Sequence, residues 1–398
     1  MNMPAIPRLR LLQESQLGDD SYHSILISAI RALAALQVTA AHLRAEFFPG
    51  LRTLENPTLW YQALAFFTGF AHQAVLVFFL ISGWLVGGSL LNKLAQPDAL
   101  KLYAIDRVTR LWTVLVPTFV LILAFGILTG TLDARNADFS PTNPFSWTAF
   151  VGNLAGLQTI SVPEFGGNFP LWSLANESWY YLLFPLLVLC AAPARAGKRL
   201  LPGALLVLLA LLLPFTIMLY FSIWLLGAGF SRVRLECDNL TRFSLLALLG
   251  ALAVYFRLTG RTSDINTATF VPYLMLSILF VLFLSSTVIK TDPRVRLLAP
   301  VRAAANVFSN FSFTLYVVHI PVLGMLGWLG VHLFDKKALA PDSLVDLGIY
   351  VAMLATVLLF SYGFYLLFEA RTYQVRRWLK GLLSSTPLPN RRAIPEKS

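Results

Sequence analysis

Long apolar runs alternate with short polar segments along most of the chain. A helix needs roughly 20 apolar residues to cross the hydrocarbon core of a bilayer, and ten of the runs are of about this length. We therefore predict an all-α polytopic membrane protein with ten transmembrane helices, at residues 25–48, 63–91, 110–130, 172–193, 200–214, 215–231, 241–258, 270–289, 307–332 and 344–370. The same pattern predicts three parts, which are a cytoplasmic segment (1–24), a transmembrane domain (25–370) and a basic cytoplasmic tail (371–398).

Two apolar stretches do not fit a single span. Residues 201–231 are too many for one helix and few for two, and Pro214 lies at their centre. Because basic residues flank both ends of this stretch, we predict two short spans. Residues 145–160 are apolar but short, and we interpret them as an interfacial or re-entrant segment within an ordered external loop or lid at about 131–170.

The composition favours a membrane protein over a soluble one. Of the 398 residues, 57% are hydrophobic and 13% are charged, whereas a soluble domain usually carries about 25% charged residues. The net charge of +11 does not indicate nucleic acid, because the basic residues are spread over short loops and the tail. Cys190 and Cys237 offer neither a disulfide framework nor the spacing of metal ligands. The first 24 residues lack the apolar core of a signal peptide, so we expect the first span to be retained.

The distribution of Lys and Arg predicts the orientation in the membrane. With both termini in the cytoplasm, 23 of the 31 Lys and Arg residues fall in cytoplasmic segments and seven fall in outer loops. The remaining one, Arg31, lies inside the first span. We therefore predict cytoplasmic termini and an external 131–170 loop. The tail after about residue 381 is expected to be a disordered basic segment near anionic lipid headgroups.

An arginine and a histidine interrupt the first predicted span. An ionisable residue at the centre of a transmembrane helix costs about 2.5–3.5 kcal/mol, so its presence needs a reason. Arg31 and His42 are eleven residues apart, which is three helical turns plus about 20°, so they share one stripe of the helix at a separation of about 16 Å. Both side chains then either reach the headgroups at opposite ends of the span, or line a polar passage with an anion-binding residue at the inner end and a base at the outer end.

Further polar residues lie near the predicted helix ends. Arg107 and Arg110 are one turn apart and share a face at the cytoplasmic end of the third span. This pair fits either anchoring to the inner headgroups or a phosphate site. Asn176 and Glu177 lie at the outer end of the fourth span, and Glu177 is expected either to pair with a loop arginine or to face His42 across the bundle.

Two more histidines lie at membrane depth. His319 is in the middle of the ninth span, where a structural role and a place in the polar passage are both open. His72 lies in the outer third of the second span and is a further candidate for lining the passage. Ser82 and Gly83 are small residues that let helices approach closely, and we predict a packing role for them.

Five motifs occur along the chain in a particular order and spacing. They are the Arg31–His42 pair, then FFLISGWL, DRVTRLW, WSLANESWYYLLFP and FTLYVVHIPV. Together they resemble the acyltransferase-3 family of integral membrane acyltransferases over roughly residues 25–370. The resemblance implies ten transmembrane helices, a cytoplasmic acyl-CoA donor and an acceptor hydroxyl, usually on a bacterial surface glycan. We therefore expect a protein of the bacterial inner membrane whose acceptor side faces outward.

The resemblance also implies roles for individual residues. His42 matches the catalytic histidine of the family, and Arg31 belongs to the donor site. Arg107 and Arg110 match a paired-arginine motif, and Glu177 matches the first acidic position of a tryptophan-serine-leucine motif. On this basis we expect His42 and Glu177 to be catalytic and the three arginines to bind the donor.

The chain departs from many family members at one position. Ser178 follows Glu177 where those members have a second acid, which puts in doubt any mechanism that needs two adjacent carboxylates. Some members carry an extra hydrolase-like domain outside the membrane. This chain ends too soon for one, so we expect the transmembrane domain itself to hold the acyl-transfer chemistry.

The residues and the resemblance lead to one chemical hypothesis. The phosphates of acyl-CoA, expected to be acetyl-CoA, bind the arginines, and His42 acts as general base on an acceptor hydroxyl or forms a covalent acyl-histidine. Glu177 orients His42 or binds the sugar of a glycan or lipid-linked oligosaccharide. No metal and no nucleic acid are expected. The candidate substrate contacts are Trp172, Ser173, Asn176, His72 and His319.

Two other functions are compatible with the same polar stripe. One is acylation of a small molecule such as a macrolide or peptide. The other is transport of a lipid-linked sugar or organic anion without chemistry. A transporter often contains inverted repeats and broken helices; the sequence shows no internal repeat, and Pro214 is the single hint of a broken helix.

Overall fold

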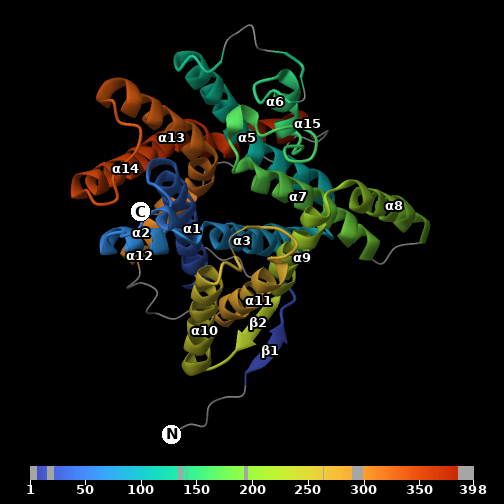
Figure 1. Cartoon of the computed structure of the whole chain (residues 1–398). Coiled ribbons are helices and arrows are strands. Elements are labelled where there is room, and N and C mark those ends of the chain that lie inside the picture. The colour runs from blue at the N-terminus through green and yellow to red at the C-terminus, as the bar shows by residue number, and fades with distance from the viewer. Residues whose placement is uncertain are drawn as a thin grey trace, which may run out of the picture.

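The computed structural model describes residues 7–15, 22–132, 138–140, 142–191, 196–262, 264–288 and 299–383. This part of the chain is a bundle of helices with one small sheet (Figure 1). Seven helical segments are long and apolar enough to cross a membrane, and three further apolar helices are shorter. Each of these ten segments overlaps one predicted run, so the prediction of a polytopic α-helical membrane protein is confirmed in outline.

The elements carry the labels of Figure 1. The helices are α1 (Tyr22–Phe47), α2 (Leu59–Phe67), α3 (Ala71–Ser82), the π-helix η2 (Gly83–Gly87), α4 (Gly88–Lys93), α5 (Ala99–Leu128), α6 (Trp147–Leu154), α7 (Leu171–Ala191), α8 (Ala196–Leu212), α9 (Phe215–Phe230), α10 (Asn239–Leu258), α11 (Phe270–Ser286), α12 (Ala299–Asn310), α13 (Ser312–Phe334), α14 (Leu344–Leu367) and α15 (Thr372–Leu383). Single 3-10 turns are η1 (Leu51–Thr53), η4 (Phe165–Gly167) and η6 (Glu369–Arg371), and the strands are β1 (Arg8–Leu11) and β2 (Val233–Glu236).

The second predicted span, 63–91, is broken rather than continuous. α2 ends at Phe67 and α3 begins at Ala71. A Cβ on Gly69, between them, would lie 2.3 Å from Nε of Arg257, so the break leaves room for a side chain from α10. The run still forms one candidate membrane span, Leu59–Lys93. The break inside it was not predicted, because an apolar run does not reveal which distant side chain occupies a gap in it.

The stretch 201–231 forms two helices, as predicted. The interfacial or re-entrant place of residues 145–160 stays a prediction. α8 ends at Leu212 and Pro214 precedes the first residue of α9, so the stretch 201–231 divides at the proline. Proline suits this place because its fixed φ and missing N–H fit a helix start. α6 is a short helix, and Ser146 caps it by accepting a hydrogen bond from the amide of Ala149 at 3.0 Å.

Both ends of the chain contain regular structure that was not predicted. β1 pairs antiparallel with β2, with Arg8 opposite Glu236. The structure is thus α-helical as predicted, with the addition of this two-stranded sheet. The predicted tail, 371–398, begins with helix α15, which packs against α5. Residues 384–398, where the disordered basic end was predicted, lie outside the described residues.

The bundle is closed around α1, which packs against α3, α12 and α13 (Figure 1). Next to it, the backbones of the α3–η2 segment and α9 touch. A Cβ on Gly83 would lie 2.0 Å from the carbonyl oxygen of Trp224, and a Cβ on Gly227 would lie 2.1 Å from that of Leu80. The packing role predicted for Gly83 is confirmed, because no larger residue fits at this crossing.

Candidate active site

Two of the predicted histidines meet inside the bundle. Nδ1 of His42 on α1 lies 2.9 Å from Nε2 of His319 on α13, and the two rings are nearly parallel, with centroids 5.2 Å apart. His319 is fully buried. The ring of Phe169 lies edge-on to His42 at 4.9 Å. We call His42 and His319 the histidine pair.

A proline in α13 places Phe169 beside this pair. Pro321 has no N–H to donate to the carbonyl of Val317, one turn earlier in the helix. The side-chain amide of Asn168 donates to that carbonyl instead, at 2.8 Å. The loop that precedes α7 is thereby tied to α13, and the next residue, Phe169, contacts His42.

The other expected partners of His42 lie elsewhere. The carboxylate of Glu177 accepts a hydrogen bond from the hydroxyl of Tyr181, one turn along the same helix. Among the described residues, Glu177 forms neither a contact with His42 nor an ion pair with a loop arginine, so both expectations for it are unmet. Among the described residues, no hydrogen bond or ring contact joins His72 to His42.

A cavity of about 400 Å³ lies between α1, α3, α5, α7 and α13, and we call it the donor cavity. The three arginines predicted to bind the donor, Arg31, Arg107 and Arg110, line it. Ser173, predicted to contact the substrate, and Glu177, predicted to be catalytic, line the same cavity. Further polar lining residues that were not predicted are Ser82, Tyr181, Ser312, Tyr316 and Arg376.

Two arginines of the donor cavity lie over aromatic rings. The guanidinium of Arg107 lies 5.6 Å from the ring centroid of Tyr181, and that of Arg110 lies 5.6 Å from the ring centroid of Phe313. Arg31 donates a hydrogen bond to the hydroxyl of Ser312 at 3.2 Å. None of the three forms an ion pair within the described residues, so their charge is available to an anion.

Glu369 is a buried carboxylate that the sequence analysis missed. It accepts hydrogen bonds from the amide and the hydroxyl of Thr314, at 3.2 and 2.6 Å, in the first turn of α13. It also lies near enough to Arg31 and Arg110 for their charges to interact. The sequence shows that Glu369 follows the last apolar run. It does not show its partners, because Thr314 is 55 residues away along the chain and the two arginines are farther still.

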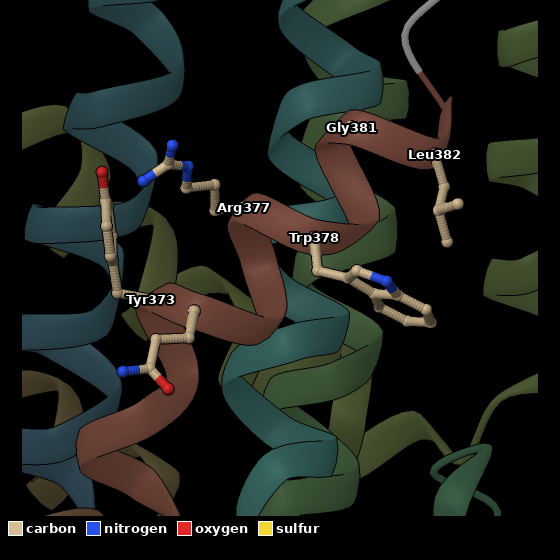
Figure 2. A pocket seen from close by; sticks show the side chains of 6 residues that line it. Tyr373, Arg377, Trp378, Gly381 and Leu382 are labelled. Atoms are coloured by element: carbon tan, nitrogen blue, oxygen red, sulfur yellow. The ribbon is translucent and has the colours of Figure 1, made fainter. Parts of the chain in front are cut away.

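Helix α15 adds a fourth arginine to the donor cavity. Arg376 lines the cavity and lies 3.2 Å from the carboxylate of Asp106 on α5. The same carboxylate oxygen lies 2.8 Å from the ammonium of Lys380. The opposite side of α15 is exposed, and Figure 2 shows Arg377 and Trp378 on it beside a shallow pocket that this helix forms alone. The donor cavity, not this pocket, contains the converging charges.

Tyr316 connects the donor cavity with the histidine pair. Its hydroxyl lies 2.6 Å from that of Ser173 and donates to the carbonyl of Pro170 at 3.0 Å. Its ring centroid lies 5.9 Å from that of His319. Because Tyr316 is one turn before His319 on α13, the donor cavity and the histidine pair lie next to each other along this helix.

The remaining predicted residues surround this connection. Trp172 is partly buried with its ring 6.5 Å from that of Phe79, and Asn176 is buried in α7. Within the described ranges, no group of three or more His, Cys, Asp or Glu side chains could hold a metal ion. Among the described residues, the charged groups and histidines that meet at this site are the four arginines, Asp106, Glu177, Glu369 and the histidine pair.

Comparison with known protein families decides the class. The acyltransferase-3 model, which describes an acyltransferase domain, matches residues 25–366. The match covers the elements from α1 to α14 except the first three residues of α1 and the last residue of α14. The chain belongs to the acyltransferase-3 family. This membrane acyltransferase therefore uses an acyl donor. No curated protein and no solved structure matches the chain.

Proposed function

We propose that this acyltransferase moves an acyl group, acetyl in the first instance, from cytoplasmic acyl-CoA to a hydroxyl of a surface or exported glycan such as an O-antigen or exopolysaccharide. The observation that supports the proposal is that Tyr316 both lines a cavity rich in arginines and contacts His319 of the histidine pair. We place the protein in a bacterial inner membrane, with the donor cavity toward the cytoplasm.

Acyl-CoA fits the donor cavity by charge and by shape. CoA carries several phosphates on a long arm, and planar guanidinium groups bind phosphate oxygens in pairs. Arg107, Arg110 and Arg376 would bind the phosphates, and Arg31 would hold the arm. Residues 31 and 42 are about 16 Å apart along α1, so the arm would run along this helix toward His42.

His42 would act as the general base. It takes the proton from the acceptor hydroxyl as the hydroxyl oxygen attacks the thioester carbonyl. The C–O bond forms and the C–S bond breaks, so the acyl group becomes an ester. The proton then passes from His42 to the departing thiolate, which leaves as the CoA thiol.

The other lining residues would position the reactants. Glu177 balances the arginine charges and fixes the Tyr181 hydroxyl, rather than acting on His42 directly. Ser173 and Asn176 on α7 are our candidates for stabilising the oxyanion. Phe169 and Trp172, at the start of α7, offer aromatic faces on which a sugar ring can stack.

Transfer of label tests the proposed function. The purified protein is incubated with radiolabelled acetyl-CoA and a panel of O-antigen, exopolysaccharide, macrolide and peptide acceptors. We expect label on a glycan, and reduction to background in His42→Ala with acetyl-CoA affinity retained. His332→Ala is the control, because His332 is an exposed histidine at the other end of α13.

Three results would redirect the proposal. Label on a macrolide or peptide would show that the acceptor is a small molecule instead of a glycan. Flux of a lipid-linked sugar or organic anion across a vesicle membrane, with no label transferred, would indicate a transporter. Undiminished transfer by His42→Ala would remove His42 as the base.

A further inference from the structure

The two ring nitrogens of His319 have different partners. Nδ1 lies 3.1 Å from the carbonyl oxygen of Leu315, one turn earlier on α13, and Nε2 lies 2.9 Å from Nδ1 of His42. A carbonyl oxygen only accepts hydrogen bonds, so Nδ1 of His319 must carry the proton. A neutral imidazole has one N–H, and Nε2 of His319 is therefore an acceptor.

The tautomer of His42 follows from that of His319. Because Nε2 of His319 accepts, Nδ1 of His42 donates, and the lone pair of a neutral His42 is then on its own Nε2. The alternative requires a proton on both nitrogens of His319. That would bury a positive charge in a fully buried side chain which no described carboxylate contacts.

We propose that His319 is a positioning residue that fixes the tautomer and the ring orientation of His42, so that Nε2 of His42 is the proton acceptor. This inference rests on the proposed function, in which His42 is the base. The orientation is held from two sides, by the nearly parallel ring of His319 and by the edge contact with Phe169. The carbonyl of Leu315 anchors this series of hydrogen bonds, because its oxygen belongs to the backbone of α13.

The proton balance keeps His319 neutral throughout. When Nε2 of His42 takes the proton of the acceptor hydroxyl, His42 becomes an imidazolium and its Nδ1–H continues to donate to His319. When the thiolate takes that proton, His42 returns to the starting tautomer. His319 neither gains nor loses a proton, and it stabilises the cation by accepting a charge-assisted hydrogen bond.

Two amides of different length test the positioning role. In His319→Gln the side-chain oxygen reaches about as far as Nε2 and can still accept from His42. In His319→Asn the amide ends near the position of Nδ1 and cannot. We expect His319→Gln to keep kcat within about tenfold, and His319→Asn to lose 10²-fold or more, because a catalytic histidine in the wrong tautomer loses up to about 10⁴-fold. The KM for both substrates should change little in either variant.

Nitrogen-15 NMR of labelled histidine reads the tautomer without any activity. We expect the Nδ1–H form of His42 in the unsubstituted protein and in His319→Gln, and a mixture of forms in His319→Asn. A predominantly Nε2–H His42 in the unsubstituted protein, or equal losses of kcat in the two variants, would overturn the proposal. These outcomes are distinct from a failure of His42 as the base, which His42→Ala reports by itself.

Discussion

At the scale of single residues, Arg107 and Arg110 of the donor cavity lie over aromatic rings and form no ion pair with a described carboxylate. Both guanidinium groups can therefore donate hydrogen bonds to a bound phosphate. Charge-assisted hydrogen bonds contribute about 1.5–3 kcal/mol each, so Arg107→Ala and Arg110→Ala should each weaken acetyl-CoA binding by at least about tenfold. Calorimetry on the purified protein measures the affinity. Arg199 is an exposed arginine at the start of α8, so Arg199→Ala is the control. Unchanged acetyl-CoA affinity in the double variant of Arg107→Ala and Arg110→Ala would show that this pair does not bind the donor.

Glu369 should stabilise the fold because its carboxylate accepts two hydrogen bonds from Thr314. Glu369→Ala leaves the amide and hydroxyl of Thr314 without their buried acceptor, which costs on the order of 1–3 kcal/mol for each buried group. Glu369→Gln keeps one oxygen as an acceptor and should lose less. The midpoint of thermal unfolding in detergent measures both variants. Equal midpoints for the alanine and glutamine variants would show that Glu369 does not anchor α13 through Thr314.

The sequence reveals the kinds of residue at the site better than their pairing. Arg31, Arg107, Arg110 and Glu177 line one cavity, although Glu177 was expected at the other end with His42. The partner of His42 is His319, 277 residues later in the chain. A spacing of eleven residues fixes a shared face of one helix, but which residue of another helix meets that face depends on tertiary packing that no local pattern encodes.

At the scale of elements, α15 is more than a solvated tail. Its two faces provide a matched pair of variants, because Arg376 lines the donor cavity and Arg377 is exposed. Arg376→Gln should raise the KM for acetyl-CoA about tenfold with kcat nearly unchanged, since a donor contact made equally in ground and transition states affects binding alone. Arg377→Gln removes the same charge from the same helix and should leave KM within about twofold. Steady-state kinetics distinguishes the two, and equal effects would assign the role to the net charge of α15.

The apolar runs predict helices well and their interruptions poorly. The spans at 172–193, 241–258 and 270–289 agree with α7, α10 and α11 to within a few residues. The break between α2 and α3 was missed, because it depends on Arg257 from another helix occupying the space at Gly69. Pro214 was the exception, since proline ends a helix through its own backbone chemistry.

At the scale of the whole molecule, the uneven distribution of Lys and Arg predicts which face meets the cytoplasm. A single cysteine at Asn143, placed in a variant without Cys190 and Cys237, should react with an impermeant thiol reagent in intact cells. A single cysteine at Arg377 should react after the cells are opened and not before. Labelling in the reverse pattern would invert the orientation, and the donor cavity would then face away from the cytoplasmic pool of acyl-CoA.

The close crossing of the α3–η2 segment with α9 has a mechanical consequence. A backbone contact that cannot admit one methyl group also cannot be compressed, so the side of the donor cavity formed by Ser82, Leu85 and Val86 keeps its shape. The other side, from α13 and α15, is held by polar contacts through Glu369 and Asp106, which can exchange with water or with a ligand. If the donor is acyl-CoA, as we propose, the rigid side fixes the shape against which it binds, and the donor would enter and leave the cavity along the side that can move.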